Sequence, residues 1–221
     1  MPAARRSPVC PVNIDHAALP FVLIGAAPAL VAAWLAPPAA AIALLALPAG
    51  VALFFRDPER TSPADPRLVL APADGTVRHA GPARPDEAPA GAWQQVTIFL
   101  SVLDVHINRT PVAGRVRHLE YVPGSFRAAF RPDAYRNEHS EIWIDRDGQT
   151  VVVRQVVGVL ARRVVCRVRP GDDVGPGQRI GLMKFGSRMD VFVPVTARLA
   201  VARGDRVRAG VTVIARLDGE S

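Results

Sequence analysis

A glycine–serine pair near the carboxyl end, Gly186-Ser187, has the residue types for a reaction of the chain on itself. Apolar residues lie on both sides of the pair, which predicts a strand, and a glycine inside a strand usually marks a bulge or a close backbone approach. If the backbone is strained at this point, the hydroxyl of Ser187 can attack the carbonyl carbon of Gly186. The pair is therefore the leading candidate for the chemistry of the chain.

A serine hydroxyl is a weak nucleophile until a neighbouring base removes its proton. Among the five histidines, His106 has the most informative setting, because it follows an apolar, strand-like run and lies among polar residues at an expected turn. A carboxylate commonly orients such a base, and Asp74 in the segment Pro72–Gly75 is a candidate. Residue types alone leave two alternatives open: a surface-loop histidine at 106, and plain turn chemistry for the Asp-Gly step at 74.

The elements that position these residues are expected to be strands. From residue 57 onward, short β-branched runs alternate with Gly, Pro and Asp turns, which indicates a mostly-β sandwich or barrel. Residues 103–107 and 131–137 are expected to form loop or short helix. The predicted strands are Gln95–Leu100, Gly114–Tyr121, Glu141–Ile144, Thr150–Val157, Ala161–Val168, Arg179–Met183, Met189–Val195 and Val211–Arg216.

An internal repeat lies near the carboxyl end. Residues 168–180 match residues 201–213 at a constant offset of 33, with a Gly-Asp turn and a second glycine turn in each copy. The pattern is typical of pseudo-symmetric β-sandwiches of the lipoyl or biotinyl kind, also called barrel-sandwich hybrids. Gly186-Ser187 lies between the copies, so a tight two-lobed scaffold could hold it under strain.

The amino-terminal part of the chain is different in texture. Residues 17–55 contain no charged side chain, and Pro37-Pro38 divides them into two apolar halves, Leu19–Ala36 and Ala39–Phe55. Each half is about the length of a short membrane helix, and both flanks are basic, which favours a hairpin with its ends in the cytoplasm. We expect a membrane-associated hairpin domain, 1–56, followed by a mostly-β domain, 57–221. A buried hairpin in a soluble core, or an interfacial one, is the alternative.

The bulk composition restricts the class of protein. The 221 residues are 49% hydrophobic and 21% charged, with a formal net charge of +7, which favours anionic partners. Basic residues form no run of five or more, and aromatics are only 6%, which argues against a nucleic-acid module. The two cysteines, Cys10 and Cys166, imply neither a disulfide framework nor a metal cluster and fit a reducing compartment.

Seven segments, in order along residues 15–216, resemble the phosphatidylserine decarboxylase family in its short prokaryotic type. Any one of them is a weak motif, but seven in the family's order are specific. The segments are Phe54–Arg60, Ala71–Gly75, Asp104–Pro111, Tyr121–Gly124, Asn137-Glu138, Gln155–Arg163 and Gly181–Asp190.

The resemblance implies a precursor that cuts itself. In the family, the serine attacks the preceding carbonyl, and the chain is cut with conversion of that serine into a pyruvoyl cofactor; no metal is needed. Here the cut would fall between Gly186 and Ser187, giving a β chain, 1–186, and an α chain, 187–221. The family's aspartate and histidine that activate the serine map onto Asp74 and His106.

The resemblance also implies decarboxylation of phosphatidylserine to phosphatidylethanolamine, with the pyruvoyl group as electron sink. His106 is the best candidate to return a proton to the substrate Cα, and Arg188 or Arg109 could pair with the lipid phosphate; solvated surface arginines are the alternative. One departure is clear: long-type members have two histidines three residues apart, whereas the second position here is Arg109. Either His106 serves both steps, or another group such as His118 or His139 shares the work.

The expected partners are the phospholipid substrate, the cytoplasmic side of the cell membrane and the two chains of one precursor, with a homo-oligomer left open and no nucleic acid. A rival hypothesis is a membrane-anchored carrier or adaptor of the lipoyl type without catalysis. Against it, the single lysine, Lys184, lies in an expected strand and not at a hairpin tip. A serine hydrolase is disfavoured because no Gly-x-Ser-x-Gly segment surrounds Ser187.

Overall fold

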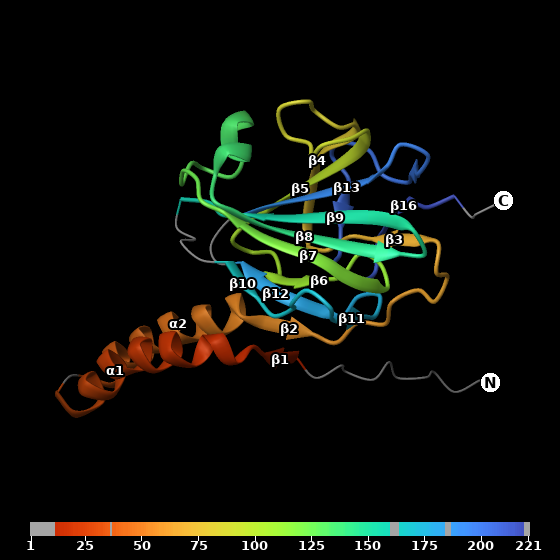
Figure 1. Ribbon diagram of the computed structural model, residues 1–221. Helices are drawn as coiled ribbons and strands as arrows, with labels where there is room; N and C mark the ends of the chain where they lie inside the picture. The colour runs from red at the N-terminus through yellow and green to blue at the C-terminus, as the bar shows by residue number, and fades with distance from the viewer. Residues whose placement is uncertain (1–11, 36, 160–163, 184–186, 219–221) are drawn as a thin grey trace, which may run out of the picture. The chain divides into compact units, whose positions relative to one another are not determined.

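The computed structural model describes residues 12–35, 37–159, 164–183 and 187–218 (Figure 1). The chain divides into two compact units, Met1–Glu59 and Arg60–Ser221. Lys184, Phe185 and Gly186 lie outside the described residues, so the predicted strand is described only from Ser187 onward.

The first unit is a helical hairpin closed by two short strands. Its elements are β1 (Val12–Ile14), the 3-10 turn η1 (His16–Ala18), α1 (Leu19–Leu35), α2 (Pro38–Phe54) and β2 (Arg56–Pro58), with β1 antiparallel to β2. Pro37 is the N-cap of α2 and Pro38 its first residue, a position where the missing N–H costs nothing. The predicted break at this proline pair is thus confirmed.

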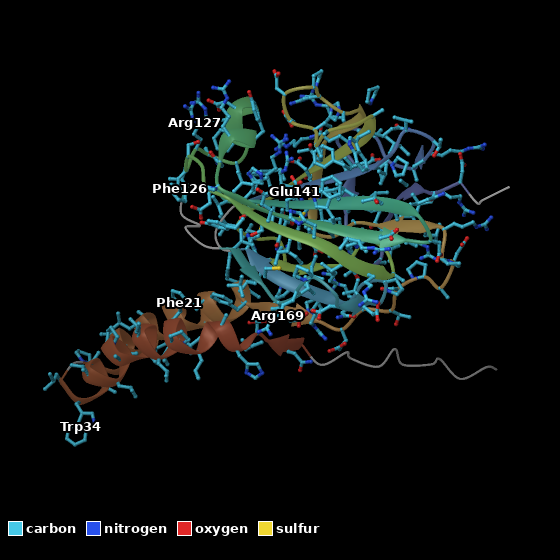
Figure 2. All side chains as sticks on the ribbon, viewed as in Figure 1. Phe21, Trp34, Phe126, Arg127, Glu141 and Arg169 are labelled. Atoms are coloured by element: carbon cyan, nitrogen blue, oxygen red, sulfur yellow. The ribbon has the colours of Figure 1, made fainter. Side chains whose placement is uncertain are left out.

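Most of the hairpin's apolar side chains are exposed, and Trp34, near the carboxyl end of α1, is 91% exposed (Figure 2). The segment His16–Leu35 is long and apolar enough to cross a membrane, whereas the apolar stretch Ile42–Phe54 is shorter. One such helix is weak evidence for membrane association, and the cytoplasmic side stays a prediction.

The second unit is built on a curled eight-stranded antiparallel sheet (Figure 1). In spatial order its strands are β11 (Asp173–Val174), β7 (Gly114–Val122), β8 (His139–Arg146), β9 (Gln149–Val156), β13 (Ser187–Pro194), β5 (Trp93–Leu100), β4 (Gly75–Pro82) and β15 (Arg206–Val207).

Two smaller sheets of three strands complete this unit. One contains β10 (Val164–Cys166), β12 (Arg179–Met183) and β6 (Ile107–Arg109); the other contains β14 (Arg198–Leu199), β16 (Val213–Arg216) and β3 (Leu68–Leu70). A 3-10 turn, η2 (Pro132–Arg136), lies in the region expected to be loop or short helix.

The mostly-β prediction is confirmed, and a strand is present in each of the eight predicted ranges. Arg179–Met183 has the predicted ends and the others are shifted; residues 161–163 of the predicted strand Ala161–Val168 lie outside the described residues. Strand β4 was missed because its register shifts between Val77 and His79, which breaks the alternation that a sequence search relies on. Strands β3 and β6 and the two-residue strands are too short to show a period.

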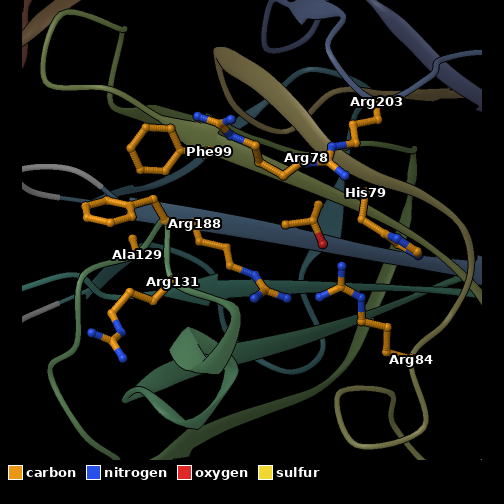
Figure 3. Close-up of a pocket in the computed structure, with 10 residues that line it drawn as sticks. Arg78, His79, Arg84, Phe99, Ala129, Arg131, Arg188 and Arg203 are labelled. Carbon is orange, nitrogen blue, oxygen red and sulfur yellow. The ribbon is translucent and has the colours of Figure 1, made fainter.

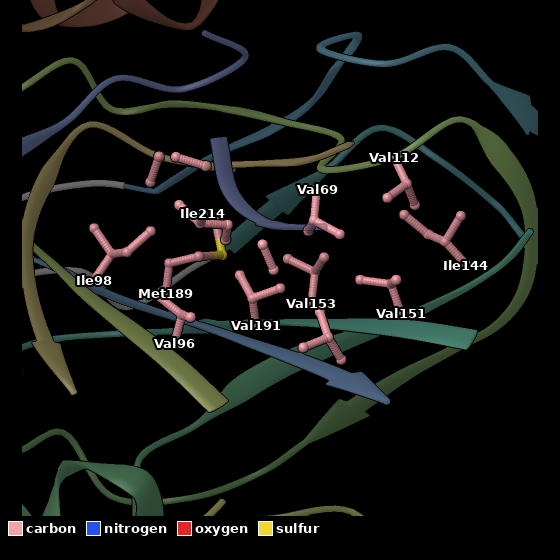
Figure 4. Close-up of a cluster of buried hydrophobic side chains, with 14 of the residues drawn as sticks. Val69, Val96, Ile98, Val112, Ile144, Val151, Val153, Met189, Val191 and Ile214 are labelled. Carbon is pink, nitrogen blue, oxygen red and sulfur yellow. The ribbon is translucent and has the colours of Figure 1, made fainter. Parts of the chain in front are cut away.

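The core lies on one face of the large sheet, which we call the inner face, and consists of aliphatic side chains (Figure 4). Alternate residues of each strand supply it, as the twofold period of a strand requires. In β13 these are Val193, Val191 and Met189, and the same row continues to Ser187. Ser187 therefore belongs to the inner face, and its neighbour Arg188 belongs to the opposite, outer face.

The predicted repeat appears as two turns of the same geometry. Gly177 and Gly210 have φ angles of 71° and 70°, which glycine adopts without steric cost. Gly177 N donates to Thr110 O at 3.0 Å, and Gly210 N donates to Ala71 O at 2.8 Å. The turn of the first copy thus bonds to the segment around Thr110, and the turn of the second copy bonds to the segment around Ala71.

The two held segments also bond to each other reciprocally. Leu70 N donates to Pro111 O at 2.8 Å, and Arg109 N donates to Pro72 O at 2.9 Å. This exchange relates the segment of Asp74 to the segment that precedes Gly114 by approximate twofold symmetry.

Candidate active site

Ser187 opens β13 opposite Leu100 of β5, on the inner face. Its side chain is fully buried, and its Oγ has no hydrogen-bond partner among the residues that the structure describes. A buried hydroxyl without a partner costs about 1–3 kcal/mol. Such a cost, at the residue selected from sequence as the nucleophile, fits a group kept for reaction and not for stability.

His106 is fully buried just before β6. Its Nδ1 lies 2.9 Å from the carbonyl oxygen of Asp104, which can only accept, so Nδ1 carries the proton. In the neutral ring Nε2 is then the basic nitrogen. Met183 N donates to His106 O at 3.2 Å, which holds His106 beside the end of β12, four residues before Ser187.

The Asp104 side chain fixes the turn that presents this histidine. Its Oδ2 accepts from the backbone N of Ser101 at 2.8 Å and from the Ser101 hydroxyl at 2.7 Å, and its Oδ1 accepts from Arg206 at 2.8 Å. The ring of His106 is therefore oriented by the backbone carbonyl of Asp104, whose side chain accepts three hydrogen bonds from Ser101 and Arg206.

The sequence hypothesis has Asp74 orienting His106, but the side chain of Asp74 makes its described hydrogen bonds to other residues. Its Oδ2 accepts from Arg60 Nη2 at 2.8 Å, its Oδ1 accepts from Arg60 Nη1 at 2.5 Å, and Oδ1 also accepts from Ala209 N at 2.8 Å. These contacts among the described residues lead to Arg60 and not to His106. A role of Asp74 in activating Ser187 stays a prediction.

The approximate symmetry of the fold nevertheless marks Asp74 as unusual. Pro72 and Pro111 occupy equivalent places in the reciprocal exchange, and each is followed three residues later by a glycine that begins a strand. The residue before the glycine is Asp74 in one lobe and Ala113 in the other. The carboxylate is therefore particular to this lobe of the pseudo-symmetric fold, where it bonds to Arg60 and to Ala209 N.

Two buried amides near Ser187 escaped the sequence reasoning. Asn108 on β6 and Gln155 on β9 are fully buried, and Gln155 Nε2 donates to Asn108 Oδ1 at 2.8 Å. Gln155 pairs with Met189, the inner-face neighbour of Ser187. Within residues 12–35, 37–159, 164–183 and 187–218, Asn108 Nδ2 and Gln155 Oε1 have no partner, and flipping both amides would still leave one donor and one acceptor unsatisfied.

A signal for Gln155 was present in the sequence. Val151 and Val153 precede it on the inner face, so the apolar alternation stops at Gln155 in β9, as it stops at Ser187 in β13. Polar residues that continue a core row at its end indicate a site, because a buried polar group is costly unless it is used or paired.

Arg188 is buried on the outer face, where it contacts the carboxylates of Glu87 and Asp190. Burial acts to lower its pKa, but the two carboxylates outweigh burial and hold the pKa above its ordinary value. Arg109 is also buried, and it donates to Gly177 O at 3.1 Å. Neither is a solvated surface arginine, and their pairing with a lipid phosphate stays a prediction.

The two histidines that could share the work of His106, His118 and His139, do not lie on the inner face with Ser187. His118 on β7 is exposed and lies 3.5 Å from Glu120. His139 on β8 is buried; it pairs with Val156, which pairs with Arg188, so His139 shares the outer face with Arg188. Among the described residues, no group of three or more His, Cys, Asp or Glu side chains could hold a metal ion.

Comparison with known proteins gives one consistent family. The family model described as phosphatidylserine decarboxylase matches residues 47–215. The chain is 43% identical over 203 residues to the phosphatidylserine decarboxylase proenzyme of Solibacter usitatus, covering 91% of this chain and 96% of the relative. It is 48% identical over 181 residues to the proenzyme of the same name from Symbiobacterium thermophilum, covering 79% and 84% of the two chains.

A third relative matches over a longer stretch than the first two but at lower identity. The phosphatidylserine decarboxylase proenzyme of Solidesulfovibrio magneticus is 39% identical over 211 residues, which cover 95% of this chain and 97% of the relative. The family expected from the seven sequence segments is confirmed. The chain belongs to the phosphatidylserine decarboxylase family of enzymes.

Proposed function

We propose that this chain decarboxylates phosphatidylserine to phosphatidylethanolamine, using a pyruvoyl group that it makes from its own Ser187. The observation that carries the proposal is the fully buried Ser187 hydroxyl, which has no partner within the described part of the chain, in a protein whose relatives are named proenzymes. A proenzyme needs a bond to cut, and this hydroxyl is adjacent in sequence to the Gly186 carbonyl.

The self-cleavage begins when Ser187 Oγ attacks the carbonyl carbon of Gly186. The Oγ proton passes to the basic Nε2 of His106, the new C–O bond replaces the Gly186–Ser187 amide bond, and the freed nitrogen takes up a proton. β-Elimination then transfers the Cα proton of residue 187 to a base and breaks its Cβ–Oγ bond, which releases the Gly186 carboxylate and leaves dehydroalanine at 187. Its hydrolysis by one water gives the pyruvoyl group and ammonia. Support for the role of His106 is its fixed tautomer beside β12.

The Asn108–Gln155 pair is the group best suited to stabilise the oxyanion of this attack. Gln155 lies on the inner face that Ser187 shares, and Asn108 Nδ2, on β6 beside it, is a buried N–H without a hydrogen-bond partner among the residues that the structure describes. A donor that waits unpaired in a dry site loses no protein hydrogen bond when charge develops, and removal of such a donor typically costs about 10²–10³ in rate.

When formed, the pyruvoyl group supplies an electron sink for the electrons left by carbon dioxide. The chain's own residues then have two tasks. The aliphatic inner face keeps water away from residue 187, and His106 returns a proton to the substrate Cα. The hairpin of unit one keeps the enzyme at the membrane that holds its substrate, which its exposed apolar side chains support.

Intact mass spectrometry of the purified chain tests the proposal. The expected products are fragments 1–186 and 187–221, the smaller with a blocked amino terminus. Ser187→Ala and His106→Ala are expected to remain whole and inactive, while His118→Ala, at an exposed histidine, is expected to cut normally. An uncut wild-type chain with full decarboxylase activity would overturn the pyruvoyl mechanism.

The same experiment distinguishes the catalytic proposal from the rival carrier function. A carrier or adaptor would remain a single chain and release no carbon dioxide from phosphatidylserine. Membership in a decarboxylase family favours the enzyme.

A further inference from the structure

The outer face of the large sheet contains a pocket of about 420 Å³ that is dominated by arginine (Figure 3). Its buried floor includes Arg188 of β13 and Thr97 of β5, and Phe99 and Phe130 form an aromatic wall. The arginines that line it are Arg78, Arg84, Arg131, Arg188 and Arg203. Because Arg188 and Ser187 point to opposite faces, the pocket is separate from the inner-face site.

The carboxylates nearby neutralise only some of these arginines. Glu87 contacts both Arg188 and Arg84. Asp190 contacts Arg188, and Asp133 lies 3.1 Å from Arg131. In the part of the chain that the structure describes, Arg78 and Arg203 have no carboxylate partner.

Positive charge in excess at one cavity is unfavourable unless an anion is present. Guanidinium groups bind phosphate oxygens in pairs, and several of them around one cavity suit a group that offers several oxygens at once. The neutralised Arg188 cannot readily leave Glu87 and Asp190, so it acts as a fixed floor. Arg78 and Arg203 are the arginines that an incoming phosphate would engage.

The aromatic wall indicates that the phosphate belongs to an amphiphile. Phe130 is 70% exposed, and its ring lies 6.3 Å from that of Phe99 in an edge-to-face arrangement. Arg78 lies over the Phe99 ring at 5.2 Å, which holds its charge at the pocket mouth. Phe126, in the same loop as Phe130, is 41% exposed (Figure 2). A free phosphate ion would gain nothing from these rings, whereas the glycerol and acyl part of a lipid would cover them.

We propose that this outer-face pocket binds the phosphate group of an anionic phospholipid, as a second lipid site distinct from the Ser187 site. The lipid would hold the catalytic unit against an anionic bilayer through Arg78 and Arg203, with Phe130 in the interfacial layer. Binding should weaken as salt concentration rises, because the exposed arginines are screened.

The test uses the full-length, uncleaved Ser187→Ala chain in a nonionic detergent, titrated by calorimetry. The probes are dihexanoyl phosphatidylglycerol, dihexanoyl phosphatidylcholine and inorganic phosphate. We expect phosphatidylglycerol to bind most tightly. The double variant Arg78→Gln/Arg203→Gln should weaken it by at least about tenfold, since charge-assisted hydrogen bonds are lost. Phe130→Ser should weaken phosphatidylglycerol and leave inorganic phosphate unchanged.

Arg117→Gln/Arg198→Gln is the matched control, because it removes the same two charges from arginines that are 66% and 84% exposed and do not line the pocket. Thermal unfolding should be unchanged in all these surface variants. Equal affinity of the double variant and its parent for phosphatidylglycerol would refute the pocket as the site. Inorganic phosphate binding as tightly as phosphatidylglycerol, with no effect of Phe130→Ser, would assign it to free phosphate and overturn the lipid proposal. Neither result depends on self-cleavage, which the Ser187→Ala chain lacks.

Discussion

Removal of the Ser187 hydroxyl should make the uncut protein more stable. The comparison needs an uncut chain that still carries the hydroxyl, so both proteins are made in the background His106→Asn. Asparagine can keep an N–H near the position of Nδ1, which bonds to the carbonyl of Asp104, but it has no equivalent of the basic Nε2. The pair to compare is His106→Asn and His106→Asn/Ser187→Ala.

The size of the effect follows from burial. The Ser187 hydroxyl is fully buried and has no partner among the described residues, so it costs about 1–3 kcal/mol of folding free energy. The substitution removes a single oxygen, and a void smaller than a methyl group costs less than about 1 kcal/mol. The expected net gain is about 1–2 kcal/mol. For a unit of this size, each kcal/mol raises the Tm by about 2–4 °C.

The assay is thermal unfolding followed by circular dichroism, with mass spectrometry to show that both proteins are whole. Thr97→Val in the same background is the matched control, because its buried hydroxyl donates to Asp190 at 2.6 Å and its removal should lower the Tm. If Ser187→Ala also lowers the Tm, the hydroxyl has a stabilising partner, and the argument that it is kept for reaction fails. If His106→Asn still cuts, His106 is not the base.

Three further outcomes are expected. Gly181→Ala should lower the stability of the uncut chain by about 1–3 kcal/mol, because its Cβ would collide with the carbonyl oxygen of Val165; urea unfolding measures this, and unchanged stability would show that β10 can move away. Glu87→Gln should cost about 3–5 kcal/mol in the same assay, because it removes a buried partner of Arg188, and a loss below about 1 kcal/mol would mean that Asp190 alone suffices. Burial lowers the pKa of His139 below 6.5, so the unfolded chain binds more protons and stability should fall as the pH drops through about 6.5. His139→Gln should flatten that part of the pH profile, and an unchanged profile would contradict the assignment.

Local patterns in the sequence predicted the frame of the molecule, because they report on local structure. The proline pair at 37-38 marked the break in the hairpin, and the glycines of the repeat marked the turns at 177 and 210. The Gly-Ser pair marked Ser187. Its burial could not be predicted in the same way, because it depends on the partner strands β5 and β9.

Long-range pairing of charges is the part that sequence reasoning could not supply. Arg188 was expected to be a solvated or phosphate-binding arginine, yet its partner Glu87 lies 101 residues away in the chain. Asp74 was expected to lie beside a histidine, and its described contacts go to Arg60 and Ala209. No period or spacing encodes such pairs, since they arise only when loops far apart in the sequence reach the same face of a sheet.

The register of β13 determines which face of the sheet Ser187 and Arg188 each occupy. Because the strand period is two, a slip of one residue would turn Ser187 outward and bring Arg188 into the aliphatic core. The slip is opposed by the ion pairs of Arg188 with Glu87 and Asp190, since a buried guanidinium without partners is far costlier than a buried hydroxyl. The charges on the outer face therefore keep the Ser187 hydroxyl on the inner face, where its Oγ has no hydrogen-bond partner among the residues that the structure describes.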